Sequence, residues 1–213
     1  MAYRAVIFDL GGVVLSSPID AFREYERREG LPHRFISEII VNSGDHGAWS
    51  QLERGEITLE EFATAFEAEC MAAGGEVRAG DMFEVLRGSG SACPEMLTAI
   101  GKIKDAGLKT AALTNNWVAD DGVGMQDRVP VLGGLFDTII ESSIVGLRKP
   151  DPAIYELVCA QLDVEPTAAI FLDDLGVNLK PARAMGMTTI KVADPLEAIA
   201  ELEAALGFPL GEG

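Results

Sequence analysis

The 213-residue sequence lacks a long apolar run, since no apolar stretch approaches the roughly 20 residues needed to cross a bilayer. It has only three cysteines, Cys70, Cys93 and Cys159, and no C-x-x-C spacing, which favours a reducing compartment over a disulfide framework. Near the N-terminus, a single arginine and an acid inside the first apolar run argue against a secretory signal peptide. We therefore expect a soluble cytoplasmic protein with no membrane partner.

Basic residues are scarce, with 17 Lys and Arg against 34 Asp and Glu and a formal net charge of −17. Such a surface repels a phosphate backbone, and no basic stripe is present, so no nucleic-acid partner is expected. A small anionic substrate would also be repelled at long range, so any phosphate site must be built locally. A hydrophobic content of 48% supports a sizeable core. We expect the protein to be a monomer or a homodimer.

Apolar periodicity divides the chain into two parts. Helical spacing dominates residues 16–92, and its clearest case is a capping box from Thr58 to Glu61 ahead of Phe62, Phe66 and Cys70. Elsewhere strands alternate with helices, which implies parallel βαβ units. After a first strand that ends near Asp9, strands are predicted at 108–113, 136–140, 169–172 and 188–192. We expect an α/β fold, with a Rossmann-like, doubly wound parallel sheet from residues 1–15 and 93–213 and a helical insertion at 16–92.

Polar clusters lie at four of the predicted strand ends. They are Asp9, Thr114-Asn115, Arg148-Lys149, and Asp173-Asp174 with Asn178. The carboxyl ends of parallel strands meet at one edge of a sheet, so these side chains can converge. Asp9 and Asp174 can share Mg²⁺, whose preferred ligands are oxygens, while Lys149 can hold a phosphoryl group. Each cluster alone has an ordinary explanation as a turn, a surface lysine or a solvated acid, but together they favour phosphoryl transfer.

Four motifs resemble those of the haloacid dehalogenase-like (HAD) hydrolase superfamily. They are Ile7–Val13, Leu113–Asn115, Lys149-Pro150 and Asp173–Asn178. The insertion resembles the type 1 helical cap of that superfamily. Longer matches at Gly55–Thr58, Val145–Pro150 and Phe171–Arg183 are similar to one branch. That branch includes the N-terminal phosphatase domain of soluble epoxide hydrolase and the HAD domain of certain acyl-CoA dehydrogenase family members.

The resemblance implies a Mg²⁺-dependent phosphatase that acts on a small phosphorylated metabolite through an aspartyl-phosphate intermediate. It assigns catalysis to Asp9 and Lys149, metal binding to Asp9, Asp174 and the Gly11 carbonyl, phosphoryl binding to Thr114, Asn115 and Arg148, and support to Asp173 and Asn178. Trp117 can line the substrate entrance or pack under the cap.

Gly11 departs from the family pattern, since family phosphatases carry at this position a second Asp that protonates the leaving alkoxide. Such acid–base catalysis contributes about 10²–10⁴-fold. A bound water or a cap residue such as His46 can replace it, or the substrate is an anomeric or acyl phosphate that needs little protonation. A halide leaving group needs no proton, but dehalogenases of the family use no Mg²⁺, and the Asp173-Asp174 pair would crowd Asp9 without a cation. The main alternative is a catalytically impaired domain that binds a phosphorylated ligand or a partner.

Overall fold

The computed structural model describes residues 2–88, 91–117 and 132–211. Within these residues, five parallel strands form one sheet in the order β3-β2-β1-β4-β5. The strands are β1 (Ala5–Phe8), β2 (Lys109–Thr114), β3 (Thr138–Glu141), β4 (Ala169–Asp173) and β5 (Thr188–Lys191). The predicted parallel α/β sheet is therefore confirmed, and its later strands begin and end within two residues of the expected positions.

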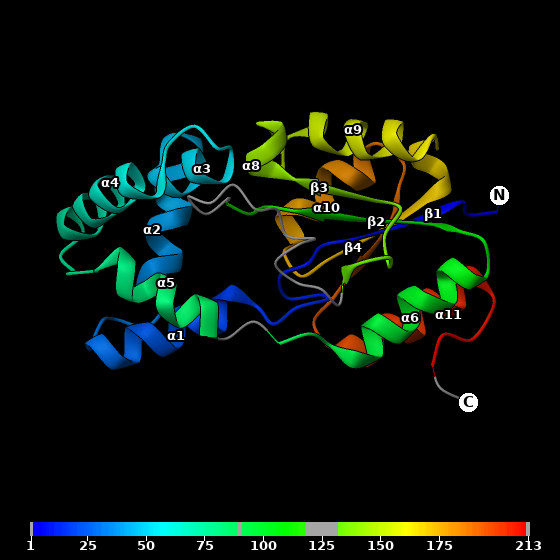
Figure 1. Cartoon of the computed structure of the whole chain (residues 1–213), viewed down its shortest axis with the longest axis horizontal. Coiled ribbons are helices and arrows are strands. Elements are labelled where there is room, and N and C mark those ends of the chain that lie inside the picture. The colour runs from blue at the N-terminus through cyan, green and yellow to red at the C-terminus, as the bar shows by residue number, and fades with distance from the viewer. Residues whose placement is uncertain (1, 89–90, 118–131, 212–213) are drawn as a thin grey trace.

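Helices cover both faces of the sheet (Figure 1). Val6 and Phe8 of β1 pack on one face, and Ala5 and Ile7 pack on the other, so the sheet separates two apolar cores. The first core lies under α6 (Pro94–Asp105) and α11 (Pro195–Leu206), and the second under α9 (Pro152–Leu162) and α10 (Gly176–Ala184). The short α8 (Ser142–Val145) follows β3, and the 3-10 turn η3 (Pro166–Ala168) precedes β4. Each fully buried Ile, Leu or Phe side chain in these cores contributes about 1.5–3 kcal/mol.

Side-chain caps explain where two of these helices begin. The Asp151 carboxylate accepts a hydrogen bond of 2.9 Å from the Ala153 amide at the start of α9, where Pro152 takes the first position. Asp194 caps α11 in the same way. Both helices thus begin directly after an aspartate that caps them, with proline in the first turn.

The inserted helices lie beyond the carboxyl ends of the strands (Figure 1). They are α1 (Pro18–Glu29), α2 (Phe35–Ser43), α3 (Ala48–Glu53), α4 (Leu59–Ala72) and α5 (Ala79–Gly88), with the 3-10 turn η1 (Gly44–His46) between α2 and α3. They enclose a third apolar core, in which Trp49 contacts the rings of Phe22, Phe62 and Phe66. The predicted capping box is present at the start of α4.

The two connections between these helices and the sheet lie side by side. Leu15 and Ala92 form an antiparallel bridge, and the Ser16 amide donates to the Ser91 carbonyl at 2.8 Å. The insertion is therefore joined to the sheet through a paired segment next to the turn that follows β1. In the part of the chain that the structure describes, no helix is both long and apolar enough to span a membrane.

Candidate functional site

The sheet register brings the strand-end residues to one edge. Phe8 of β1 pairs with Ala112 of β2 and Leu172 of β4, and the Asp9 amide donates to the Leu172 carbonyl at 2.8 Å. Thr114 and Asp173 are the last residues of β2 and β4, rather than the residues that follow those strands. Asp9 therefore lies between two strands whose polar ends stand beside it.

Lys149 connects two of the predicted carboxylates. Its Nζ lies 2.9 Å from Asp9 Oδ1 and 2.7 Å from Asp173 Oδ2, and its side chain is 1% exposed. Burial by itself would lower the pKa of Lys149, but the charges of Asp9 and Asp173 outweigh it and the pKa is raised. The ammonium group is also 5.6 Å from the centre of the Phe171 ring. Lys149 is thus a buried cation beside Asp9.

Asp173 is held from several directions and is fully buried. Its Oδ1 accepts hydrogen bonds from the Leu175 amide at 2.8 Å and from Asn178 Nδ2 at 3.0 Å. Its Oδ2 receives Lys149 and a second contact of 3.1 Å from Asn178. Tyr155 donates to the Asn178 carbonyl at 2.7 Å and so fixes that residue. With both oxygens occupied, Asp173 positions Lys149.

Three carboxylates crowd together at this edge. One oxygen from each of Asp9, Asp173 and Asp174 lies within 4.8 Å of the others. Burial raises the pKa of Asp9 to about 8, with Asp173 and Asp174 adding to the rise and Lys149 opposing it. Burial, followed by the charge of Asp173, raises the pKa of Asp174 to about 6. Such a group of oxygens suits a hard divalent cation, and the donor set fits Mg²⁺.

The missing side chain of Gly12 leaves the space that the Asp174 carboxylate occupies. The backbone of Gly12 has φ +76°, and a Cβ there would stand 2.4 Å from Asp174 Oδ2. A side chain at this position would therefore displace the carboxylate as well as strain the turn. Gly12, the second glycine of the motif, therefore lets Asp174 lie against the loop after β1.

Asn115 contacts the backbone of Lys149. Its Nδ2 donates to the Lys149 carbonyl at 2.9 Å, and its Oδ1 accepts from the Lys149 amide at 2.8 Å. Both ends of the amide are thus engaged in placing Lys149, although the sequence predicts that Asn115 binds a phosphoryl group. The buried Thr114 hydroxyl makes a longer contact, 3.4 Å from the Asn115 carbonyl, and lies at the same strand edge.

Arg148 points away from this cluster and toward the inserted helices. Its Nε and Nη2 each lie 2.8 Å from Glu53 Oε2 at the end of α3, and its Nη1 lies 3.6 Å from Asp45. Glu53 Oε1 accepts a hydrogen bond of 2.9 Å from Trp49 Nε1. Burial raises the pKa of the Glu53 carboxyl, while Arg148 opposes that rise. The structure therefore places Arg148 in an ion pair between sheet and insertion, and it adds Glu53, which sequence spacing gave no means of finding.

Trp117 and His46 are the other two residues singled out from the sequence. The Trp117 ring lies 5.7 Å from that of Trp49 and 5.1 Å from that of Phe83, so it packs against the inserted helices. His46 lies in η1, where it is exposed and its carbonyl accepts from Gln51. It has no hydrogen bond or ion pair to the carboxylate cluster among the contacts of the described residues.

Gly11 faces the first residue of α1. A Cβ built on Gly11 would lie 3.3 Å from Pro18 Cδ, which is tighter than an ordinary contact. The φ of Gly11 is not in the left-handed region, so the limit at this position is the Pro18 ring. The space beside Gly11 is thus partly filled by the insertion.

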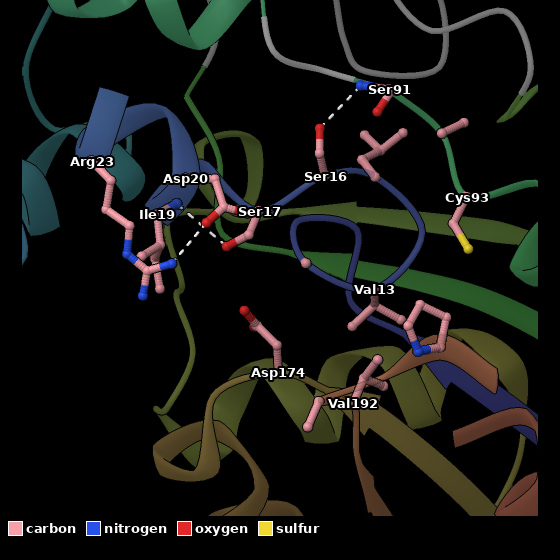
Figure 2. Close-up of a pocket in the computed structure, with 15 residues that line it drawn as sticks. Val13, Ser16, Ser17, Ile19, Asp20, Arg23, Ser91, Cys93, Asp174 and Val192 are labelled. Carbon is pink, nitrogen blue, oxygen red and sulfur yellow. Dashed lines mark hydrogen bonds and ion pairs between the residues drawn. The ribbon is translucent and has the colours of Figure 1, made fainter. Parts of the chain in front are cut away.

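A cavity of about 410 Å³ opens beside Asp174. Figure 2 shows Asp174 on one side of the cavity and α1 with Asp20 and Arg23 on another, while the paired connections at Ser16 and Ser91 lie at the top of the view. Gly12 and Asp174 belong both to this cavity and to the carboxylate edge, so the cavity adjoins the candidate metal site.

The chain is similar to several curated proteins. It is 41% identical over 215 residues to acyl-CoA dehydrogenase family member 10 of Mus musculus, a match that covers 100% of this chain and 20% of the relative. It is 37% identical over 222 residues to bifunctional epoxide hydrolase 2 of Sus scrofa, covering 99% of this chain and 40% of the relative. A third relative, a sesquiterpene phosphatase of Aspergillus oryzae, is 29% identical over 206 residues, with 96% and 97% covered. The chain thus spans two fifths or less of the first two relatives.

One solved structure and one family model also match the chain. A HAD family enzyme of Bacteroides thetaiotaomicron, solved with magnesium and inorganic phosphate, has a TM-score of 0.62 and 20% identity, covering 89% of this chain and 94% of that one. At that identity the likeness shows the fold. The family model for haloacid dehalogenase-like hydrolases matches residues 3–186. Because that match spans most of the sequence, the chain belongs to the haloacid dehalogenase-like hydrolase family.

Proposed function

We propose that the chain is a Mg²⁺-dependent phosphomonoester hydrolase that acts on a small phosphorylated metabolite and forms an aspartyl-phosphate on Asp9. The observation that carries the proposal is the buried Lys149 ammonium between Asp9 and Asp173, next to the Asp174 carboxylate. The sesquiterpene phosphatase that matches the chain over nearly its whole length supports the same reaction class. We also propose that α1–α5 act as the cap and that the enzyme works in the cytoplasm.

The metal would be held by Asp9, Asp174 and the Gly11 carbonyl. Asp173 is less suited to direct ligation, because its two oxygens already accept from Lys149, Asn178 and the Leu175 amide. When bound, Mg²⁺ supplies positive charge to the oxygens of the phosphoryl group. Asp173 and Asn178 are then supporting residues that fix Lys149.

The residues of the chain account for the bond changes. An oxygen of Asp9 attacks phosphorus, the bond from phosphorus to the ester oxygen breaks, and its electron pair leaves on the alkoxide. Water then attacks phosphorus in the aspartyl-phosphate, which releases inorganic phosphate and restores Asp9. Lys149 neutralises charge on the transferring group, and the Thr114 hydroxyl donates to it. With glycine at position 11, the alkoxide takes its proton from water, so substrates with stable leaving groups are favoured.

Two alternatives follow from the same residues. A domain that binds a phosphorylated ligand or partner without turnover is favoured by the absence of an acid at Gly11, beside which Pro18 leaves little space. Dehalogenation is disfavoured, because Asp173 and Asp174 crowd negative charge around Asp9 and this arrangement calls for a cation.

The test is a screen of phosphorylated metabolites with Mg²⁺, run on the parent and on Asp9→Asn. We expect Asp9→Asn to lose at least about 10³-fold in kcat, because it removes the nucleophile. Asp105→Asn, at the exposed end of α6, is the matched control and should keep full activity. Hydrolysis at equal rates by the parent and by Asp9→Asn would exclude the proposed reaction.

Gly11→Asp tests the missing acid. If only a proton donor is lacking, alkyl phosphates should be hydrolysed faster, by up to about 10²-fold. Acyl phosphates should change little, since their leaving groups need no proton. The Pro18 ring must shift by a few tenths of an ångström to admit the new side chain. A fall in activity on both substrate types would show that space at Gly11 matters more than the acid.

A further inference from the structure

The cavity beside Asp174 contains a basic side chain, although the protein has a net charge of −17. Among the described residues that line it, Arg23 is the one with a basic side chain, and the acids are Asp20 and Asp174. The other lining residues are small, apolar or hydroxyl-bearing, such as Val13, Ile19 and Ser17. Among the described lining residues, Arg23 therefore carries the positive charge that can attract an anion.

Asp20 holds the Arg23 side chain in place. Both residues lie on α1, three positions apart, and Arg23 Nη1 donates to Asp20 Oδ1 at 2.8 Å. Figure 2 shows this pair on the α1 side of the cavity and Asp174 on the other side. A guanidinium has five N–H donors, so one bond to Asp20 leaves donors for a ligand. The side chain is 53% exposed and therefore accessible from the cavity.

The position of Asp174 relates this arginine to the reaction. In the proposed function, the phosphoryl group is bound at Asp9 and Asp174, and Asp174 also lines the cavity. In-line attack by Asp9 leaves the organic part of the substrate on the opposite side of phosphorus. The inserted helices lie beyond the carboxyl ends of the strands, where this part can extend (Figure 1). The α1 wall of the cavity is therefore a place for that organic part.

We propose that Arg23 is a specificity-determining residue that binds a second oxyanion, such as a carboxylate, on the organic part of the substrate. The proposal rests on the proposed function and names its substrate class: short phosphomonoesters that carry a second negative group. Planar guanidinium and carboxylate groups match in two parallel hydrogen bonds. Without Arg23, Asp20 and Asp174 would repel such a group, so the arginine decides whether it is accepted.

The same helix supplies a matched control. Glu24 and Arg27 form an equivalent ion pair one turn further along α1, with 53% and 71% of their side chains exposed. Neither residue lines the cavity. Arg27→Gln therefore removes the same charge from the same helix and leaves the cavity unchanged, whereas Arg23→Gln removes the charge from the cavity wall.

The experiment measures binding of compounds that cannot be hydrolysed. Calorimetric titrations with Mg²⁺ compare 3-phosphonopropionate with propylphosphonate, and then 4-phosphonobutyrate with butylphosphonate, on the full chain. We expect the parent to bind the carboxylate-bearing member of at least one pair about tenfold more tightly. Arg23→Gln should reduce that ratio to about one while the Kd of the alkylphosphonate stays constant. Arg27→Gln should keep the ratio of the parent.

Several outcomes would overturn the proposal. These are equal binding of both members of each pair by the parent, failure of every phosphonate to bind, and a preference that survives Arg23→Gln or is lost equally in Arg27→Gln. Failure of the proposed function is distinguished by hydrolysis, which depends on Asp9. An Arg23-dependent preference without Asp9-dependent turnover would contradict the phosphatase reaction and leave the role of Arg23 standing.

Discussion

The inserted helices meet the sheet in two different ways. The docked side is defined by Glu53, Gly55 and Trp117. There an ion pair, a close backbone approach and a contact between aromatic rings cross the boundary. At the open side, defined by Asp20, Arg23 and Asp174, the same boundary holds a cavity of about 410 Å³. The docked side carries buried groups paired with one another, whereas the open side carries half-exposed charges.

This difference separates positioning from ligand binding. Arg148, which pairs with Glu53, is the neighbour of Lys149, so the docked side anchors the backbone next to the buried ammonium. Asn115 holds that backbone from the sheet. The open side makes no contact of this kind with the Lys149 backbone among the described residues, and its cavity can accept a ligand. Changes at the docked side should therefore act on stability, and changes at the open side should act on substrate choice.

The largest effect at the docked side is expected for Glu53→Ala. It leaves Arg148 and the Trp49 indole N–H without their buried partner, and breaking such a pair costs about 3–5 kcal/mol. Denaturant unfolding monitored by tryptophan fluorescence measures the loss. Glu56→Ala is the control, because it removes a carboxylate that is 49% exposed from its pair with Arg54, and it should cost less than about 1 kcal/mol. Equal losses in the two variants would remove the distinction between buried and exposed pairs.

Gly55→Ala should have the next largest effect. A Cβ on Gly55 would lie 2.3 Å from the Ser143 carbonyl oxygen, and its φ is +66°. Gly30→Ala is the matched control, because Gly30 has φ +69° and nothing within 4 Å of its Cβ position. Both variants carry the backbone strain, and overpacking should cost Gly55→Ala a further 1–3 kcal/mol or so in the free energy of unfolding. If the two variants were equally stable, the close contact between Gly55 and Ser143 would be disproved.

Trp117→Leu should have a smaller effect. The side chain is half-buried, and the substitution removes its ring contacts with Trp49 and Phe83 while keeping an apolar group there. The expected loss is about 1–2 kcal/mol of unfolding free energy. A double-mutant cycle with Phe83→Leu measures how much of it comes from that pair, and additive losses would show that the rings do not act together.

The residues at the carboxylate edge could be predicted because parallel strands impose their position. Asp9 and Asp174 are far apart in the sequence, but each directly follows a strand, and such strand ends converge in a doubly wound sheet. Lys149 lies further from its strand, after α8, and its ammonium group still reaches Asp9 and Asp173. Their catalytic and metal-binding roles stay predictions. The environment of Arg148 could not be predicted, since its partner Glu53 lies 95 positions away in an insertion whose orientation no local pattern determines.

Local rules also missed one helix. The apolar periodicity did not single out α10, in which Gly176 and Pro181, two poor helix formers, both lie. The helix forms because Leu179 and Ala182 pack into the core beneath it, and such tertiary packing outweighs propensity. Asn178, which contacts Asp173, is thus carried on a helix.

The smallest predicted effect is a pH dependence at the docked side. Burial raises the pKa of the Glu53 carboxyl above 4.5, its ordinary value, although Arg148 opposes the rise. An acid whose pKa is raised in the folded state contributes stability that is fully present below its unfolded pKa and is lost as pH rises through the folded pKa. Glu53→Gln has no such titration and keeps an amide oxygen that can accept from Trp49. The unfolding free energy of the parent minus that of Glu53→Gln should therefore fall as pH rises from about 4, in denaturant titrations at matched ionic strength. A difference that stays constant or grows with pH would mean that Arg148 compensates fully for the burial of Glu53, which would make the docked side an electrostatic gain rather than a positioning device.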